Sequence, residues 1–561
     1  MTSALAQGFQ AKSLSLKEAM KQSARALWAG PLFRWRFSSF RPQSIQYAPL
    51  DFYLADPALA HEFYHGRFAL AGRIVHTGAL SPFAVEAPTI DWEIALHDFS
   101  WLKHFDATQA AIASAHARSL LNEWIDTTSY QKNSLPWRGD VVGKRIIAWL
   151  SHSPMLLDGA SEGFRKRFLK SLGFQVRFLK TAIFRMPENE NRLFAEIALA
   201  FSALCLPVSE NQRKKARLYL EKSLAKQILP DGGHISRNPA LLIDLLTNLI
   251  SLRYAYADCN EEPPYQLIAV IERMLPALRF FLHRDMTIAR FNGVGPLLPQ
   301  RLSNLLELDE TEAGILTHAR HSGYQRLSAE ETTIIADTGT IPPKIASSHA
   351  NAGCLSFEMS SGQHRFVINC GIDPYGPENF TMVGRSTAAH STATINDTSS
   401  SRFKTKHHEK RIVSGPTKIT LEKILDNNRN GFIATHNGYV SRFNLMHERG
   451  LALSHNGNMI DGYDRFFSPG SDVPSSNGRD QVAIRFHLHP DVIVSHQGNG
   501  ELHLEIKGGD IWTFSSPDVQ PQLEDSIDLA GLNGPQRCQQ IVLSFRPSFV
   551  SRARWRFKRV S

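Results

Sequence analysis

The sequence predicts a multidomain protein with an α-helical first half and a β-sandwich second half. The chain has 561 residues, which is more than one hydrophobic core accommodates, so two or three domains are expected. Apolar residues recur at helical spacing from about residue 106 to residue 281, whereas short alternating segments follow from residue 324 onward. We place the boundary between Asn304 and Tyr324 and predict domains of residues 1–320 and 321–561.

The helical half contains seven well-defined segments in which apolar residues recur at helical spacing. Several of these segments end at Pro, Gly or Asn, as helices commonly do. Successive helices with short links favour paired helices arranged as an arc, an incomplete α/α toroid. A plain helical bundle has the same periodicity and stays open as an alternative. The predicted helices are Gln109–Trp124, Gly143–Ser151, Glu162–Phe184, Arg192–Leu206, Gln212–Gln227, Ala240–Tyr256 and Tyr265–Leu282.

The second half alternates apolar and polar residues in short runs that Gly, Asn and Asp separate. Many short strands without intervening helices predict an antiparallel β-sandwich. The clearest predicted strands are Thr332–Ala336, Cys354–Met359, Arg365–Asn369, Ile412–Val413, Lys418–Leu421, Val482–Leu488 and Asp491–Ser495.

Composition limits the class of partner. There are 62 basic and 53 acidic residues, a mild excess of +9 that would attract an acidic polysaccharide, a nucleic acid or an anionic membrane alike. The chain has no zinc finger, RNA-binding aromatic signature or long Lys/Arg run, so nucleic acid is not an expected partner. The five cysteines are far apart and odd in number, which predicts neither a disulfide framework nor a CxxC metal pair.

The first forty residues do not read as a secretory signal. Met1–Gln10 lacks a basic start, and the stretch after it lacks an unbroken apolar core. Leu16–Phe33 is basic with spaced apolar residues, so residues 15–40 are a candidate for peripheral membrane contact or for a cap on the first domain. We predict no transmembrane segment, because no stretch reaches the ~20 apolar residues that span a bilayer.

The densest polar cluster of the helical half is Asp231–Pro239, with the sequence DGGHISRNP. Its two glycines permit a tight turn, and an apolar helix follows at once. A helix start with His234 and Arg237 beside it is a candidate site for a carboxylate or sulfate. The alternative is a capped turn, with Asn238 as the N-cap and Pro239 at the first helical position.

Further polar clusters stand at the starts and ends of predicted elements. Asn189–Arg192 opens a helix, where capping and function are both open. Ser347–Asn351, Asn369–Gly371 and Arg385–Thr392 flank predicted strands in the second half. Histidines at the edges of adjacent strands can converge on one site, although a lone histidine is more often structural.

These clusters, in this order, resemble the heparinase II/III family of polysaccharide lyases. The best-matched stretch runs from His349 to Thr392, where HANAGCLSFE, FVINCG and RSTAAHSTATI are similar to successive family motifs. HNGYVSRFNLMHER (His436–Arg449), FHLHP (Phe486–Pro490) and DGGHISRNP extend the similarity, which covers the chain from about Phe168 to its end. The family joins an incomplete α/α toroid to a β-sandwich, so the resemblance implies that fold here.

The resemblance also implies an activity. Such lyases cleave uronate-containing chains by β-elimination, in which the carboxylate is neutralised, a base removes the C5 proton and an acid protonates the departing oxygen. Asn191 matches a family Asn that contacts the substrate carboxylate, and His349 matches the family's catalytic His. The other predicted substrate contacts are Arg192, Arg237 and Asn238, and the other predicted proton-transfer residues are His234 and Tyr375.

The chain departs from the family pattern at three places. Asn191-Arg192 stands where many members have Asn-His, and Leu241-Leu242 stands where they have Tyr-His, so the usual catalytic tyrosine is missing. The family's zinc ligands His, Asp and His correspond here to Asn351, Asn369 and His390. Because neutral carboxamides are weak zinc ligands, we predict no metal site and no cofactor.

Two functions from different classes remain open. The first is a carbon–oxygen lyase that acts on an acidic polysaccharide, and the second is a glycan-binding protein that kept the cleft and lost the chemistry. A weaker third interpretation is a peripheral envelope factor that uses the basic N-terminal stretch. The resemblance implies the cell envelope or periplasm, and the lack of a recognisable signal peptide leaves the cytoplasm as the alternative.

Overall fold

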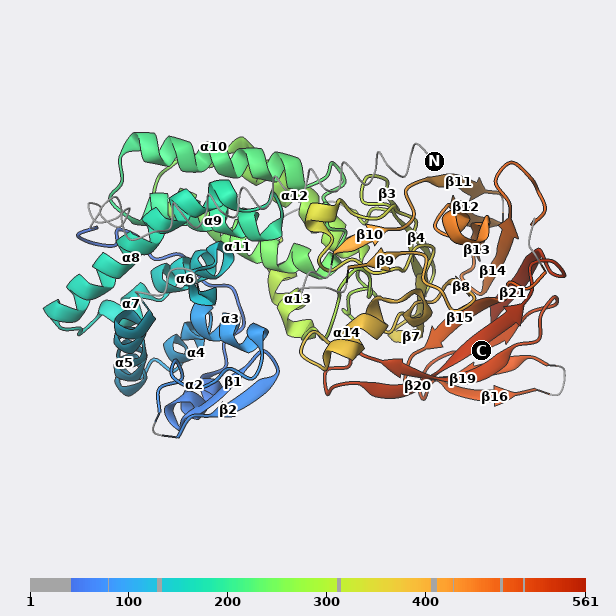
Figure 1. Cartoon of the computed structure of the whole chain (residues 1–561), viewed down its shortest axis with the longest axis horizontal. Helices are drawn as coiled ribbons and strands as arrows, with labels where there is room; N and C mark the ends of the chain where they lie inside the picture. Colours follow the sequence, from blue (N-terminus) through green and yellow to red (C-terminus); the bar gives the residue numbers. More distant parts are fainter. Residues whose placement is uncertain are drawn as a thin grey trace. The chain divides into compact units, whose positions relative to one another are not determined.

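The computed structural model describes residues 42–560 except 79, 129–133, 310–313, 405–410, 427, 475–477 and 498–499 (Figure 1). The chain forms two compact units. One consists of Met1–Ser223 and Ile250–Pro264, and the other of Leu224–Leu249 and Tyr265–Ser561. The basic segment at residues 15–40 lies outside the described residues, so membrane contact through it stays a prediction.

The first unit is mainly helical and packs around aromatic side chains. Phe99 is fully buried, and its ring centroid lies 4.9–5.6 Å from those of Trp101, Trp124 and Trp149. Such edge-to-face and tilted contacts add to the area that the rings bury. The elements of this unit are α2 (Pro57–Tyr64), β1 (Arg67–Leu70), β2 (Arg73–His76), α3 (Ile90–Asp98), α4 (Leu102–Asp106), α5 (Ala111–Thr128), α6 (Gly139–Ser151), α7 (Ser153–Leu157), α8 (Glu162–Ala182) and α9 (Glu190–Cys205).

Helix α9 is buried because a glycine lets it approach α6 closely. A Cβ added at Gly143 of α6 would lie 3.1 Å from Cα of Ala195. The side chain of Asn189 caps α9 by accepting a hydrogen bond from the Arg192 N–H. The cluster that the sequence singled out at residues 189–192 is therefore the first turn of a central helix.

The division between the units falls within α10 (Glu210–Gln227) and α11 (Pro239–Asp258). The second unit continues with α12 (Tyr265–Phe280) and α13 (Pro299–Glu307), and the first strand after them begins at His318. The change from helices to strands thus lies in the predicted interval. The compact unit around the strands also takes in helical residues that the domain prediction of residues 1–320 assigned elsewhere.

Two large antiparallel sheets contain most strands of the second unit, and β9 and β10 pair in a separate small sheet. One large sheet has the strand order β11-β12-β13-β14-β21-β18-β17-β16, and the other has the order β19-β20-β15-β7-β6-β5-β4-β3, with β8 also paired to β15. The strands are β3 (His318–Ala319), β4 (Tyr324–Ala329), β5 (Thr332–Asp337), β6 (Phe357–Ser361), β7 (His364–Ile368), β8 (Ala393–Ile395), β9 (Arg402–Phe403), β10 (Ile412–Ser414), β11 (Ile419–Leu425), β12 (Arg429–His436), β13 (Met446–Ser454), β14 (Met459–Phe467), β15 (Val482–Leu488), β16 (Ile493–His496), β17 (Leu502–Glu505), β18 (Ile511–Ser515), β19 (Gln522–Asp528), β20 (Gln536–Phe545) and β21 (Arg552–Arg559). Two short helices, α14 (Glu378–Arg385) and α15 (Val440–Phe443), interrupt them.

The two sheets share one hydrophobic core. Phe357 of β6 stacks on Trp555 of β21 with ring centroids 5.6 Å apart, so the contact bridges the sheets. Along β21 every second residue is buried, as a strand with one solvated face requires. The predicted order of helices followed by antiparallel sheets is confirmed, and each of the seven predicted helices is present with ends within four residues.

One helix in the described part of the chain is long and apolar enough to cross a membrane. This helix is α11, and 67% of its apolar window is buried inside the protein. Burial of that kind is also typical of a core helix in a folded domain, so composition alone does not make α11 a membrane span.

A buried histidine ties the start of the described chain to the helices of the first unit. The His152 ring lies 2.8 Å from an Asp106 carboxylate oxygen and 3.1 Å from one of Asp51. Burial alone would lower the pKa of His152, but the hydrogen bonds to Asp106 and Asp51 raise it above its ordinary value. Charged His152 therefore stabilises the fold, fully so below the unfolded pKa near 6.5.

We predict that His152 stabilises the protein more in acid than in base. Its raised pKa means that the stabilisation is lost as pH rises through the folded-state pKa. His152→Gln should cost about 1.5–3 kcal/mol at pH 5.5, the range for hydrogen bonds to charged groups, and less at pH 8.5. Thermal unfolding of both proteins at the two pH values measures this. An equal loss of stability at both pH values would show that the charge on the imidazole does not stabilise the fold.

Candidate active site on the second unit

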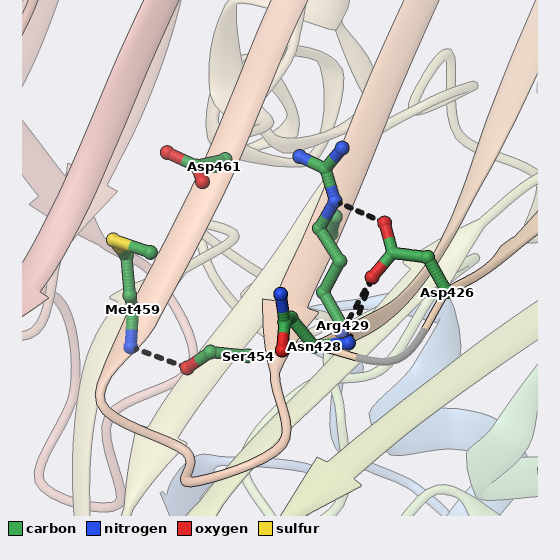
Figure 2. Close-up of a pocket in the computed structure, with 7 residues that line it drawn as sticks. Asp426, Asn428, Arg429, Ser454, Met459 and Asp461 are labelled. Carbon is green, nitrogen blue, oxygen red and sulfur yellow. Dashed lines mark hydrogen bonds and ion pairs between the residues drawn. The ribbon is translucent and has the colours of Figure 1, made fainter.

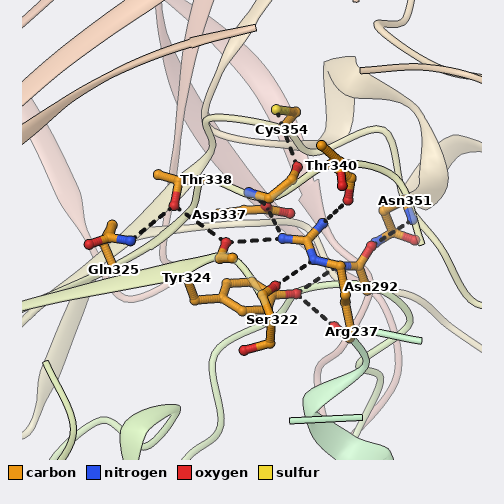
Figure 3. A network of polar contacts seen from close by, with 12 residues as sticks. Arg237, Asn292, Ser322, Tyr324, Gln325, Asp337, Thr338, Thr340, Asn351 and Cys354 are labelled. Carbon is orange, nitrogen blue, oxygen red and sulfur yellow. Dashed lines mark hydrogen bonds and ion pairs between the residues drawn. The ribbon is translucent and has the colours of Figure 1, made fainter. Parts of the chain in front are cut away.

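Three loops of the second unit are joined by one chain of hydrogen bonds, and we call them the three-loop site: residues 228–238, 290–295 and 347–352. Tyr324 donates its hydroxyl proton to the Arg237 carbonyl at 2.6 Å and accepts from Asn292 Nδ2 at 2.7 Å (Figure 3). Asn292 Oδ1 in turn accepts the Asn351 N–H at 3.0 Å. Residues far apart in the sequence are thereby fixed together.

Arg237 anchors the first loop instead of facing solvent. Its guanidinium donates to the carbonyls of Ser322, Gly323 and Thr340 at 2.7–3.1 Å (Figure 3). It also forms an ion pair with Asp337, and only 9% of its side chain is exposed. Burial alone would lower the pKa of Arg237, but the neighbouring Asp337 carboxylate raises it, so the guanidinium stays charged.

Arg237 has an unusual backbone conformation, and its guanidinium passes closely over a glycine. Arg237 itself has φ +60, in the left-handed region that few side chains adopt. A Cβ at Gly339 would lie 2.2 Å from Arg237 Nη2, so only glycine lets the guanidinium pass. The role predicted for Arg237, contact with a substrate anion, is therefore corrected: its donors are taken by protein carbonyls and Asp337.

His234 is likewise a structural residue, which corrects its predicted role in proton transfer. It is 1% exposed, and its ring nitrogens lie 2.8 Å from Ser236 Oγ and 3.0 Å from Gln227 Oε1. The Ser236 N–H also donates to Nδ1, so Nδ1 is the unprotonated nitrogen. Burial lowers the pKa of His234 to about 3, which keeps the ring neutral at physiological pH.

Asn238 caps α11, as the alternative interpretation of the cluster proposed. Its Oδ1 accepts the Ala240 N–H at 3.0 Å, and Pro239 occupies the first helical position. The amide nitrogen of Asn238 is directed toward the second loop, where it lies 3.4 Å from the place of a Cβ on Gly293. Capping and substrate contact use different atoms of this side chain, so its predicted contact stays a prediction.

His349 is the exposed histidine of the three-loop site. Gly293, with φ +95, lies directly against it: a Cβ there would be 2.7 Å from His349 Cβ and 3.0 Å from its carbonyl oxygen. Gly293 also adjoins Asn238, so the site brings two predicted residues, His349 and Asn238, beside one glycine. The packing fixes the backbone of His349 while its side chain reaches solvent.

Arg385 holds the loop of His349 from within, a role that the sequence did not indicate. This fully buried arginine ends α14 and donates to the carbonyl of Ala350 at 2.8 Å and to that of Ser347 at 3.4 Å. Its own carbonyl accepts the Ala352 N–H at 2.9 Å. Hydrogen bonds on both sides of His349 therefore come from one side chain, 36 residues further along the chain.

Tyr375 lies on a fourth loop that adjoins the second. The Ile372 N–H donates to the Val294 carbonyl at 3.1 Å, and a Cβ at Gly295 would lie 2.7 Å from the Ile372 carbonyl. Tyr375 is 46% exposed, so its phenol is accessible. Its role in proton transfer stays a prediction.

Two of the residues at the family's zinc positions, Asn351 and His390, bind each other, and the third, Asn369, binds other groups. His390 Nδ1 donates to the Ser386 carbonyl at 2.7 Å, which leaves Nε2 to accept from Asn351 Nδ2 at 3.2 Å. Asn369 Oδ1 accepts the Ser391 N–H at 3.0 Å. Burial lowers the pKa of His390 to about 4. One imidazole and two carboxamides engaged in this way do not fit zinc, and no group of three His, Cys, Asp or Glu suited to a metal occurs among the described residues.

Asn191 and Arg192 belong to the first unit, at the start of α9. Within the described part of the chain, the half-buried Asn191 side chain makes no hydrogen bond. Arg192 Nε donates to the buried Glu196 carboxylate at 2.9 Å, which fixes the guanidinium along the helix. The predicted action of these two residues on the same sugar as His349 stays a prediction.

Leu241 and Leu242, which the family resemblance matches to a Tyr-His pair, lie in the first turn of α11. Leu242 is buried, and neither side chain can transfer a proton. Among the described residues of the three-loop site, His349 is thus the exposed imidazole.

Residues 312–556 match the family model described as heparinase II/III-like, C-terminal. The second half of the chain is therefore similar to the C-terminal domain of heparinase II/III-like proteins, and we call it the heparinase II/III-like domain. FtsZ-localized protein C of Caulobacter vibrioides (strain NA1000 / CB15N) is 26% identical over 540 residues, which cover 94% of this chain and 92% of that protein. This similarity extends beyond the heparinase II/III-like domain into the helical half.

Solved structures show the same fold. A crystal structure of heparinase III is 14% identical with a TM-score of 0.66, over 87% of this chain and 80% of that one. A crystal structure of heparan sulfate lyase HepC from Pedobacter heparinus is 15% identical with a TM-score of 0.59, over 98% and 90%. The predicted toroid-plus-sandwich fold class is confirmed, and at this level of identity the likeness concerns the fold alone.

We predict that Arg237 is required for stability of the heparinase II/III-like domain. Arg237→Ala leaves Asp337 buried without its partner and should cost about 3–5 kcal/mol. Arg237→Lys keeps the charge but loses the guanidinium hydrogen bonds to the backbone carbonyls. Its free energy of unfolding should therefore lie between those of the unchanged protein and Arg237→Ala. Urea unfolding followed by tryptophan fluorescence measures both.

The matched control for this prediction is Arg320→Ala, which removes an exposed arginine just before β4. It should change stability by no more than about 0.5 kcal/mol. An Arg237→Ala protein as stable as the control would contradict the anchoring role.

Proposed function

We propose that this protein is a polysaccharide lyase that cleaves an acidic, uronate-containing chain by β-elimination. The setting of His349 carries the proposal. Its side chain is exposed, while Arg385 and Gly293 hold the backbone on either side of it. A proton-transfer residue needs both properties, because it must reach the substrate and keep its geometry.

In the proposed reaction, neutral His349 removes the proton from C5 of the uronate. The released electron pair forms the C4–C5 double bond as the bond from C4 to the glycosidic oxygen breaks. The Tyr375 phenol donates a proton to that departing oxygen. Asn191 and Arg192 keep the role that their family match implies and stabilise the negative charge that gathers on the carboxylate. No residue in this scheme requires a metal.

We predict that the purified protein converts a suitable uronate polymer into unsaturated products that absorb in the ultraviolet. His349→Ala should lower kcat/KM by about 100-fold or more, the usual effect of losing a general base. His496→Ala is the matched control, because His496 is an exposed histidine on β16 and has no role in the scheme. It should retain full activity.

The result that would overturn the lyase proposal is also defined. It fails if every uronate polymer in a panel stays intact while the protein is folded by circular dichroism. The assignment of His349 as the base fails if His349→Ala and His496→Ala are equally active, since the absorbing product would then arise without His349.

The second candidate function is that of a non-catalytic glycan-binding protein of the cell envelope. Two observations favour it: Leu241 and Leu242 replace a proton-transfer pair, and the relative similar over nearly the whole chain is named for its localisation with FtsZ. This function predicts that the protein binds an oligosaccharide without cleaving it. It also predicts that a fluorescent fusion of the protein colocalises with FtsZ. An evenly distributed fusion would argue against this localisation.

A further inference from the structure

A groove crosses the outward face of the sheet that contains β12, β13, β14 and β21, away from the loops described above. It has a volume of about 780 Å³, and its lining includes Gly450, Tyr463, Arg552, Arg554 and Arg556. A smaller hollow of about 450 Å³ shares Arg429, Ala452 and Asp461 with it, so the two are continuous (Figure 2). We call this surface the outer-sheet groove.

Small residues at neighbouring outward positions of β12 and β13 make room for the groove. Gly431 pairs with Ala452, and Gly450 pairs with Tyr463, so these residues share one face of the sheet. A Cβ at Gly450 would lie 2.2 Å from Tyr463 Cε1, which shows that the tyrosine ring lies across the glycine. Larger residues on the outward face of β13 would fill the groove and displace Tyr463.

Strand β21 supplies a row of cations along the groove. Arg552, Arg554 and Arg556 alternate with core residues and are exposed. Because alternate residues of a strand lie roughly 6.6–6.8 Å apart, the guanidinium groups follow one line. Of the four arginines in the lining, Arg429, Arg554 and Arg556 are paired with Asp426, Asp518 and Asp461. Arg552 is therefore the cation of the groove that a carboxylate-bearing ligand can reach.

The arginines of the row are held in place in different ways. Arg554 forms two hydrogen bonds to Asp518 at 2.7 and 2.9 Å, and Arg556 donates to Asp461 at 2.6 Å. The guanidinium of Arg552 instead lies 4.2 Å from the centre of the Tyr463 ring, a cation–π contact. Among the described residues, Arg552 has no carboxylate partner, so its planar fork of donors is left for an external carboxylate.

We propose that the outer-sheet groove binds a carboxylate-bearing oligosaccharide, with Arg552 as its carboxylate contact. The exposed Arg–Asp pairs present donors and acceptors side by side, which suits the hydroxyl groups of a sugar chain. The uronate class of this ligand rests on the proposed function, whereas the site shares no residue with the three-loop site.

The test measures binding of a galacturonate hexamer to the full-length protein by isothermal titration calorimetry. Arg552→Ala should weaken binding roughly tenfold, as expected for the loss of charged hydrogen bonds. Ser515→Glu places a carboxylate beside Arg556, its partner across β18 and β21, and should weaken binding without disturbing the core. Arg537→Ala is the matched control: Arg537 is an exposed strand arginine without a carboxylate partner among the described residues, on the other sheet.

In this design the groove proposal and the lyase proposal can be overturned independently of each other. Weaker binding in Arg552→Ala and Ser515→Glu but not in Arg537→Ala supports the groove, whether or not His349-dependent product forms. Unchanged affinity in both groove variants, or no binding at all, overturns it even if the polymer is cleaved. An oligoglutamate peptide that binds more tightly than the hexamer with the same Arg552 dependence also overturns it, because the occupant would then be an acidic protein segment.

Discussion

The buried ion pair between Arg237 and Asp337 is the interaction on which the candidate site depends (Figure 3). A buried arginine is tolerated only when its charge and its donors are all matched, and here Asp337 and three backbone carbonyls match them. The same contact forces Arg237 into a left-handed backbone conformation that presents its carbonyl to Tyr324. From Tyr324, hydrogen bonds continue to the loop of His349, so one charge pair sets the position of all three loops.

The sequence predicted the elements well because helix and strand periodicity depend on neighbouring residues. It could not predict the anchoring of Arg237, because Asp337 lies 100 residues further along and nothing in the spacing marks the pair. The same holds for Arg385, whose partners flank His349, and for His234, whose burial becomes evident only once Gln227 of α10 faces it. A polar cluster in a sequence therefore indicated where the chain turns, and the structure decided which side chains face inward.

Hydrogen bonds hold the region of Asn351 and His390, which the family resemblance matches to zinc ligands. A zinc ion would hold three loops through charged or imidazole ligands, and its loss would leave buried groups to be satisfied. Here an amide of Asn351 reaches His390, and Asn369 binds the backbone of Ser391 and the buried Glu358. The residues at these positions fit one another, because each carboxamide has a hydrogen-bond partner within the protein. A carboxylate or imidazole bound to zinc would not need such a partner.

Burial also separates the histidines that can change charge from those that cannot. With pKa values lowered to about 3 and about 4, His234 and His390 stay neutral throughout the physiological range, and protonating them would require acid that also weakens the fold. They can orient loops but cannot exchange protons with a substrate near pH 7. A pH dependence of catalysis between pH 5 and 8 would therefore have to come from other groups. In the three-loop site His349 is the exposed histidine, and for this reason the chemistry assigned to the site rests on that side chain.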